Sequence, residues 1–250
     1  RIDMKTKQPN GYIFYRGASQ IDGQPIVAVA IRGSANSKTG NMVQTYILPD
    51  NGLSPFINAK NGNDKTVCGD CKHKPTKGKT CYVFLPQGAN QVHKGVMQGS
   101  YPESLEDASI MCTNRVNRMG AYGNPSAVPT PVWEQLNKYT TGHCSYEHNW
   151  LDELGKFDPS IMKYSMASVD SEEEYHLAKD KGYRTFRVKA FEDRILPNEI
   201  VCPASEEMGK KVQCINCKLC SGNTIKAKDI VINVHGRSKN KFKGITVATV

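Results

Sequence analysis

The first fifty residues carry three short apolar runs that are separated by polar turns. These runs cover residues 11–17, 25–33 and 43–50 and are rich in β-branched and aromatic side chains. Because Gly, Asn, Asp and Pro punctuate them, the pattern predicts three short β-strands. The polar stretch at residues 33–42 is expected to be a plain hairpin loop, although its Gly, Ser and Thr could also cradle a phosphate.

From about residue 113, strand-like runs alternate with helical segments. The strand-like runs are residues 114–123, 143–150, 164–169, 183–190 and 229–236. One helix is expected to begin with Thr130 as its cap and Pro131 at its first position. A second helix is capped by Asp170 or Ser171 and ends at Gly182. This alternation predicts right-handed crossovers and a mostly parallel sheet, closed as a barrel or open as a part-barrel.

The two patterns together predict one α/β domain over residues 1–250. Residues 1–100 would form an antiparallel, β-rich N-terminal extension, and residues 101–250 would form the alternating part. No internal repeat and no low-complexity tract divides the chain.

Ligands of parallel sheets usually lie beyond the carboxyl ends of the strands. Polar side chains at the predicted ends make this edge a candidate substrate site. The simplest roles are structural, with Asp170 as a helix cap and His148 as a hydrogen-bonded histidine. Polar residues on both faces of 143–150 fit either a polar barrel interior or an edge strand that faces water. The candidate substrate-binding residues are His148, Asp170, Arg187, His235 and Arg237.

The composition of the chain bears on its expected partners and compartment. The 250 residues carry a formal net charge of +9, which favours polyanionic partners such as nucleic acid or nucleotides. No apolar run approaches the length of a membrane helix, so no membrane partner is expected. The start of the chain lacks the apolar core of a secretory signal, and Met4 is expected to be the native first residue.

The chain has nine cysteines, and the clustered ones are expected to bind metal and not to form disulfides, because the compartment is expected to be reducing. Cys214, Cys217 and Cys220 follow one another in double two-residue steps, which resemble the run that holds a [4Fe–4S] cluster. Cys202 completes a set of four thiols and is followed by proline, although it precedes the triplet. The sequence therefore predicts a [4Fe–4S] cluster at this set, with zinc as the alternative.

A second group consists of Cys68, Cys71 and Cys81. Its fourth ligand is left open between His73, Cys112 and a group that is not protein. Three thiolates and an imidazole would suit zinc, whereas an iron–sulfur cluster with one open iron would leave a position for a substrate or cofactor. Cys144 is expected to be a core residue.

The order of these motifs resembles an uncharacterised group of phage proteins. The shared stretches include "SANSKTGNMVQTYIL", "CGDC" followed by "CYV", "GAYGNPSAVP", "MASVDS", "YRTFRV" and "CPASEEMGKKVQCINCKLCSG", and they extend from about residue 17 to 222. The resemblance implies a viral protein that acts in the host cytoplasm.

More distantly, the chain is similar to phage proteins with a radical-SAM-like, TIM-related part-barrel. In those proteins an early cysteine group that ends in Cys-Tyr precedes the parallel strands. The resemblance implies an open cluster at Cys68, Cys71 and Cys81, an auxiliary or structural site at the C-terminal four, and S-adenosylmethionine as a candidate cofactor. Radical SAM enzymes space their three cysteines by three and two residues, whereas the spacings here are two and nine.

Three functions follow as hypotheses. The first is a redox or radical enzyme with a metal cluster that acts on a nucleotide or nucleic acid. The second is a zinc-stabilised nucleic-acid-binding protein in phage replication or host takeover. The third is a non-catalytic inhibitor that binds a host protein.

Overall fold

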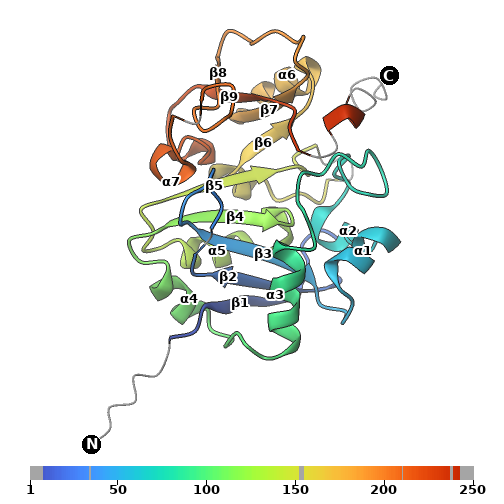
Figure 1. Cartoon of the computed structure of the whole chain (residues 1–250), viewed down its shortest axis with the longest axis vertical. Coiled ribbons are helices and arrows are strands. Elements are labelled where there is room, and N and C mark those ends of the chain that lie inside the picture. The colour runs from blue at the N-terminus through green and yellow to red at the C-terminus, as the bar shows by residue number, and fades with distance from the viewer. Residues whose placement is uncertain (1–7, 34, 152–154, 210, 237–238, 243–250) are drawn as a thin grey trace, which may run out of the picture.

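The chain folds around one nine-stranded sheet, seen in Figure 1 as a ladder of arrows along the long axis. The computed structural model describes residues 8–33, 35–151, 155–209, 211–236 and 239–242. The strands are β1 (Gly11–Ala18), β2 (Pro25–Ile31), β3 (Val43–Pro49), β4 (Val116–Tyr122), β5 (Gly142–Glu147), β6 (Met166–Val169), β7 (Thr185–Lys189), β8 (Glu199–Val201) and β9 (Asp229–Asn233).

The strand order is β1-β2-β3-β4-β5-β6-β7-β9-β8. The pairs β1–β2 and β2–β3 are antiparallel, and every later pair is parallel. The sheet does not close, so β1 and β8 form its two edges. The expected mixed α/β fold with a mostly parallel sheet is therefore confirmed.

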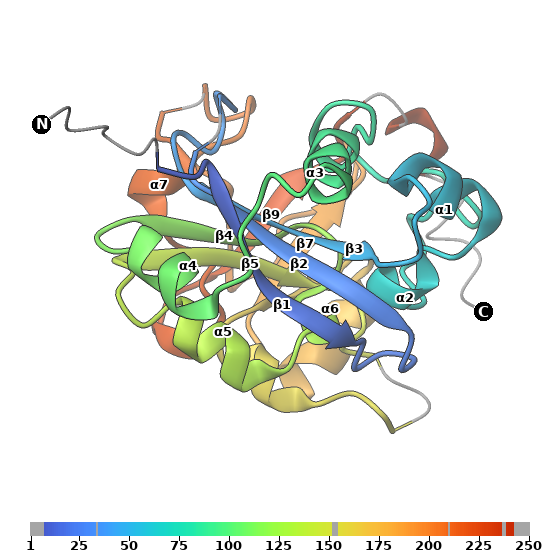
Figure 2. The same cartoon turned by 90° about the horizontal axis from the view of Figure 1, so that it is seen from below.

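Seven α-helices among the described residues lie on both sides of this sheet (Figure 2). The helix α4 packs on β1 and on α5, whereas α1 and α3 pack on β3 and α6 packs on β6 and β7. The helices are α1 (Pro55–Asn61), α2 (Lys65–Cys68), α3 (Gly88–Met97), α4 (Leu105–Met111), α5 (Thr130–Leu136), α6 (Glu172–Asp180) and α7 (Cys214–Cys217).

The expected division at residue 100 differs from the structure in two respects. Residues 55–97 hold α1, α2 and α3, so this region is not β-rich. In addition, β3 already pairs in parallel with β4, so the parallel series begins at residue 43 and not near residue 113. The three helices escaped prediction because they have only four to ten residues each, which is too short for a clear apolar period.

The two predicted helices begin and end close to the expected residues. The helix α5 starts one position earlier than expected, with Pro129 as its cap. The side chain of Ser171 caps α6 by accepting a hydrogen bond from the backbone N–H of Glu174, which decides between the two expected caps. The helix ends at Asp180 with Lys181 as its cap, and Gly182 follows with a φ of 77°, the left-handed conformation that glycine adopts at low cost.

Two apolar clusters hold the fold together. The larger one fills the space between the first strands and α4, α5 and α6, around the fully buried Trp133 and Leu136. The smaller one lies beneath the C-terminal cysteines, where Met166, Phe186 and Ile230 pack together. Among the described residues, no helix has the length and apolar character needed to cross a membrane.

Candidate functional site

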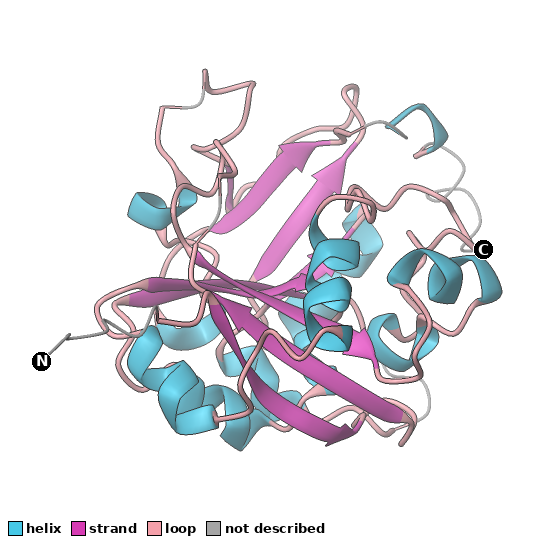
Figure 3. Cartoon of the chain, turned by 60° about the horizontal axis from the view of Figure 1, so that its bottom comes forward, coloured by secondary structure: helices cyan, strands magenta, loops and turns pink. Residues whose placement is uncertain are grey.

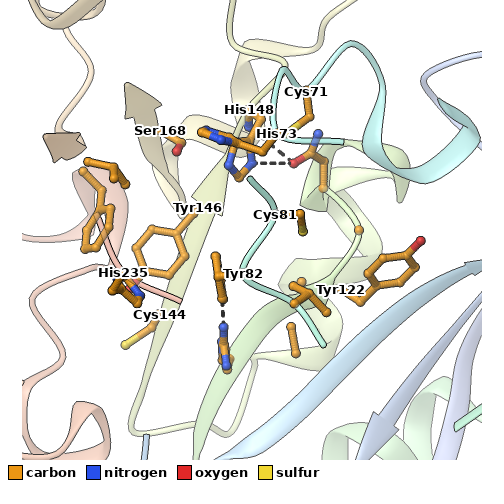
Figure 4. A pocket seen from close by; sticks show the side chains of 18 of the residues that line it. Cys71, His73, Cys81, Tyr82, Tyr122, Cys144, Tyr146, His148, Ser168 and His235 are labelled. Carbon is orange, nitrogen blue, oxygen red and sulfur yellow. Dashed lines mark hydrogen bonds between the residues drawn. The ribbon is translucent and has the colours of Figure 1, made fainter. Parts of the chain in front are cut away.

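A cavity of about 330 Å³ lies on the face of the sheet that carries inward side chains of β4 to β7. It reaches past the carboxyl ends of these strands, where Asn124, His148 and His235 line it (Figure 4). Pockets of this size are typical of small-molecule sites, and this edge is where parallel sheets bind ligands. The segment before α3 meets the segment after β9 here, with the ring centroids of Tyr82 and His235 5.9 Å apart. Figure 3 shows the strands of the sheet with helices on both of its sides.

The loop that carries the first cysteine group follows β3 and is tied to β6. The imidazole of His73 makes two hydrogen bonds, 2.7 Å to the Thr80 hydroxyl and 2.9 Å to the Asp170 carboxylate. Lys72 forms ion pairs with both Asp170 and Glu174. Burial raises the pKa of Asp170, but the His73 hydrogen bond and the nearby positive charges outweigh burial and hold this pKa below its usual value.

Cys68, Cys71 and Cys81 all line the large cavity. Burial raises the pKa of the Cys68 and Cys71 thiols, for Cys71 to about 12, whereas Cys81 is exposed to solvent. The three thiols also lie close enough to raise one another's pKa values. A bound cation would reverse this effect, because metals bind the thiolate form.

Neither expected protein ligand completes this group. Both ring nitrogens of His73 are engaged by Thr80 and Asp170. Cys112 is fully buried at the end of α4, within the larger apolar cluster, and does not line the cavity. The open alternative that remains from the sequence is a fourth ligand that is not protein.

Two buried polar groups beside these thiols lack partners. One carboxylate oxygen of Asp64 makes no hydrogen bond, and its nearest cation is Lys74 at 3.8 Å. The hydroxyl of Tyr122 likewise lacks a well-aligned hydrogen bond among the described residues, and burial and the neighbouring Cys68 thiol raise its pKa. Asp64 acts electrostatically on Cys68 and Cys81, so it is a further candidate ligand that the sequence analysis missed.

The four C-terminal cysteines line a second, much smaller cavity of about 10 Å³, which shares Tyr146 and Cys214 with the wall of the first. Cys202 follows β8, whereas α7 and the turn after it bring the other three to the same place. The turn depends on Lys218, whose φ of 55° is left-handed. Cys144, expected in the core, also lines this cavity and the large one. The ligand candidates here are Cys202, Cys214, Cys217 and Cys220.

The loop that precedes β3 supports α7 through backbone hydrogen bonds. The backbone N–H of Cys214 donates to the carbonyl of Lys38, and that of Ile215 donates to the carbonyl of Thr39. Both hydrogen bonds are 3.0 Å long. The expected hairpin loop thus has a specific task, which is to dock the second cysteine group against the sheet. Lys38 and Thr39 also line the large cavity, so the two cysteine groups lie at different parts of one interior space.

In the parts of the chain that the structure describes, no three His, Cys, Asp or Glu side chains are arranged as a finished metal site. The thiols of each group share a cavity, but they must still move together to ligate a common ion. Metal binding by the seven cysteines therefore stays a prediction.

The candidate substrate residues fall into different environments. His148 and His235 line the cavity, and burial lowers the pKa of His148 to about 4, so this imidazole is neutral at pH 7. Asp170 does not line the cavity but holds His73, which does. Arg187 is committed to a buried ion pair with Glu199. Arg237 lies outside the described residues.

Arg118 and Tyr82 line the cavity and were missed by the sequence analysis. The guanidinium of Arg118 donates a 3.0 Å hydrogen bond to the Tyr82 hydroxyl, which Figure 4 marks with a dashed line below Tyr82. The one available signal was an arginine inside an apolar run, at the third position of β4.

The lysine-rich stretch at residues 72–79 is largely engaged in local contacts. Lys72 pairs with Asp170 and Glu174, and Lys77 pairs with Asp70. These ion pairs reduce the positive charge that the stretch could offer to nucleic acid.

Comparison with protein-family models, with curated proteins and with solved structures finds no match to this chain.

Proposed function

We propose that the protein is a metal-dependent redox or radical enzyme whose iron–sulfur cluster is held by Cys68, Cys71 and Cys81. The observation that carries this proposal is the position of the three thiols on the wall of a ligand-sized cavity, at the carboxyl ends of parallel strands. Catalytic centres of parallel α/β proteins usually lie at this edge.

The absence of a fourth thiol in this group supports an open position. His73 and Cys112 are engaged elsewhere, and Asp64, which acts electrostatically on Cys68, is the protein group that we consider for the fourth place. A cluster bound here would supply single electrons to a substrate in the cavity. The chain itself would exclude water and orient that substrate through Arg118, Tyr82 and His148.

The second group has a different role in this proposal. Its cavity of about 10 Å³ has room for roughly one water-sized sphere, which suits a single ion better than a [4Fe–4S] cluster. We therefore favour zinc at Cys202, Cys214, Cys217 and Cys220, with the structural task of fixing α7 against the loop at 33–42.

The remaining parts of the proposal rest on the motif resemblance. They are a radical-SAM-like part-barrel, S-adenosylmethionine as candidate cofactor, and a phage protein that acts in the host cytoplasm. A nucleotide fits the basic balance of the chain better than a long nucleic acid, because the ion pairs of residues 72–79 compete with a phosphate backbone.

Metal and acid-labile sulfide analysis of protein purified without air tests the proposal. We expect iron and sulfide in equal amounts, a broad visible absorption, and one zinc per chain. A colourless protein with zinc alone would instead favour the zinc-stabilised binding protein. A metal-free, folded protein would contradict both.

A further inference from the structure

Arg118 presents a cation to the interior cavity without an acidic partner. It extends from the middle of β4, and its partner among the described residues is the neutral hydroxyl of Tyr82. No carboxylate of the described chain lies within ion-pair distance of it. A guanidinium has five N–H donors, so several remain free to bind a ligand in the cavity.

Two buried arginines of this protein are matched within the chain. Arg187 makes two 2.7 Å hydrogen bonds to the carboxylate of Glu199. Arg184 donates to four backbone carbonyls. Arg118 is half-buried on the cavity wall and bonds to the Tyr82 hydroxyl, so its guanidinium is open to a partner from outside the chain.

The cavity as a whole favours an anion. None of the described residues that line it is Asp or Glu. Lys38 adds a second cation on the wall. Positive charge in a partly enclosed, low-dielectric space attracts an anion more strongly than it would on the surface.

Aromatic side chains around Arg118 add a flat apolar surface. Tyr146 packs on Phe186 with ring centroids 4.6 Å apart, and both rings line the cavity. Tyr82 and Tyr146 lie near enough to act on the charge of Arg118. Such walls suit a planar ligand body, and the cation would fix the orientation of its charged end.

We propose that this cavity binds a small, flat organic anion whose carboxylate or phosphate group pairs with Arg118. The ring of that ligand would lie between Tyr82 and Tyr146. This inference deepens the proposed function by naming a substrate class, but its evidence is the cavity and not the cysteines.

Calorimetric titration of the purified, metal-containing protein with benzoate, phenyl phosphate and neutral benzamide tests the inference. We expect at least one of the two anions to bind at least tenfold more tightly than benzamide, and the tighter anion identifies the charged group. Arg118→Gln should weaken that binding about tenfold or more, since a charged hydrogen bond is lost. The exposed Arg194→Gln is the matched control and should bind like the original protein.

The inference is overturned if neither anion binds, if benzamide binds equally well, or if Arg118→Gln binds as tightly as the original protein. Release of metal by Arg118→Gln would also overturn it, because Arg118 would then be a counter-ion of the thiolates. If Arg118→Gln does not fold, a crystal structure with the bound anion decides by whether its charged group contacts Arg118. If protein purified without air contains no metal but still binds the anion, the result contradicts the proposed function and leaves this inference intact.

Discussion

The Nε2 atom of His73 lies 2.9 Å from the carboxylate of Asp170, which comes ninety-seven residues later in the chain. This bond fixes the first cysteine loop to the end of β6. The same imidazole binds Thr80 through Nδ1, so it also holds the two sides of the loop together. The position of Cys71 and Cys81 therefore depends on one histidine that is not expected to bind metal itself.

Replacing Asp170 by Asn should loosen this loop. The substitution removes the charge that pairs with His73 and Lys72, and we expect the stability to fall by about 1–3 kcal/mol. Amide hydrogen exchange of residues 69–81 should become faster than in the original protein. Asp180→Asn, at the exposed end of α6, is the control. Unchanged exchange in Asp170→Asn would show that the bond does not hold the loop.

Cys217→Ser should remove the second metal and destabilise the fold. Structural metal binding is coupled to folding, so losing one of four ligands is expected to lower the unfolding temperature and the zinc content together. Cys112→Ala is the matched control, because Cys112 is buried in the larger apolar cluster and lines neither cavity. Full zinc occupancy in Cys217→Ser would exclude Cys217 as a ligand.

Cys144→Ala should leave both metals bound. Cys144 lines the two cavities, but it lies on β5 and packs in the smaller apolar cluster. We therefore expect it to be part of the cavity wall and not a metal ligand. We expect a modest loss of stability from the missing sulfur and unchanged zinc per chain. A loss of zinc equal to that of Cys217→Ser would instead make Cys144 one of the ligands.

Glu147 should make the stability depend on pH. Burial raises the pKa of this carboxyl from 4.5 to about 7, although the backbone N–H groups of Ser126 and Asn149 donate to it. The folded protein therefore holds the proton more tightly than the unfolded chain does. This contribution is fully present below pH 4.5 and is lost as the pH rises toward and through 7, in total about 3 kcal/mol at 1.36 kcal/mol per pKa unit.

Denaturant unfolding at several pH values between 4.5 and 8 measures this effect. As the pH rises, the unfolding free energy of Glu147→Gln should increase relative to that of the original protein. The exposed Glu106→Gln should show no such trend. A difference that stays constant across this range would mean that Glu147 titrates normally.

The strands were predictable because their apolar runs are short, β-branched and well punctuated. Eight of the nine strands lie within or close to predicted runs, and β8 was missed because it has only three residues. The pairing of β3 with β4 was not predictable, since sixty-six residues and four helices separate them. An apolar pattern identifies a strand but not its distant neighbour.

Two cysteine groups could be proposed from their spacing alone, but their surroundings could not. Cys214, Cys217 and Cys220 lie within seven residues, so any compact turn brings them together. The bond from His73 to Asp170 joins segments far apart in sequence, and only the fold brings them into contact. The same holds for Arg118 and Tyr82, whose roles depend on the cavity between them and β5.

The central claim is that Cys68, Cys71 and Cys81 hold an iron–sulfur cluster at the interior cavity. Its most direct test is the iron and sulfide content, after purification without air, of a variant in which all three are replaced by Ser, compared with Cys112→Ala. We predict that the triple variant loses its iron, its sulfide and its visible absorption but keeps the zinc, whereas Cys112→Ala keeps all of them. Equal iron and sulfide in the triple variant and the control would contradict the account.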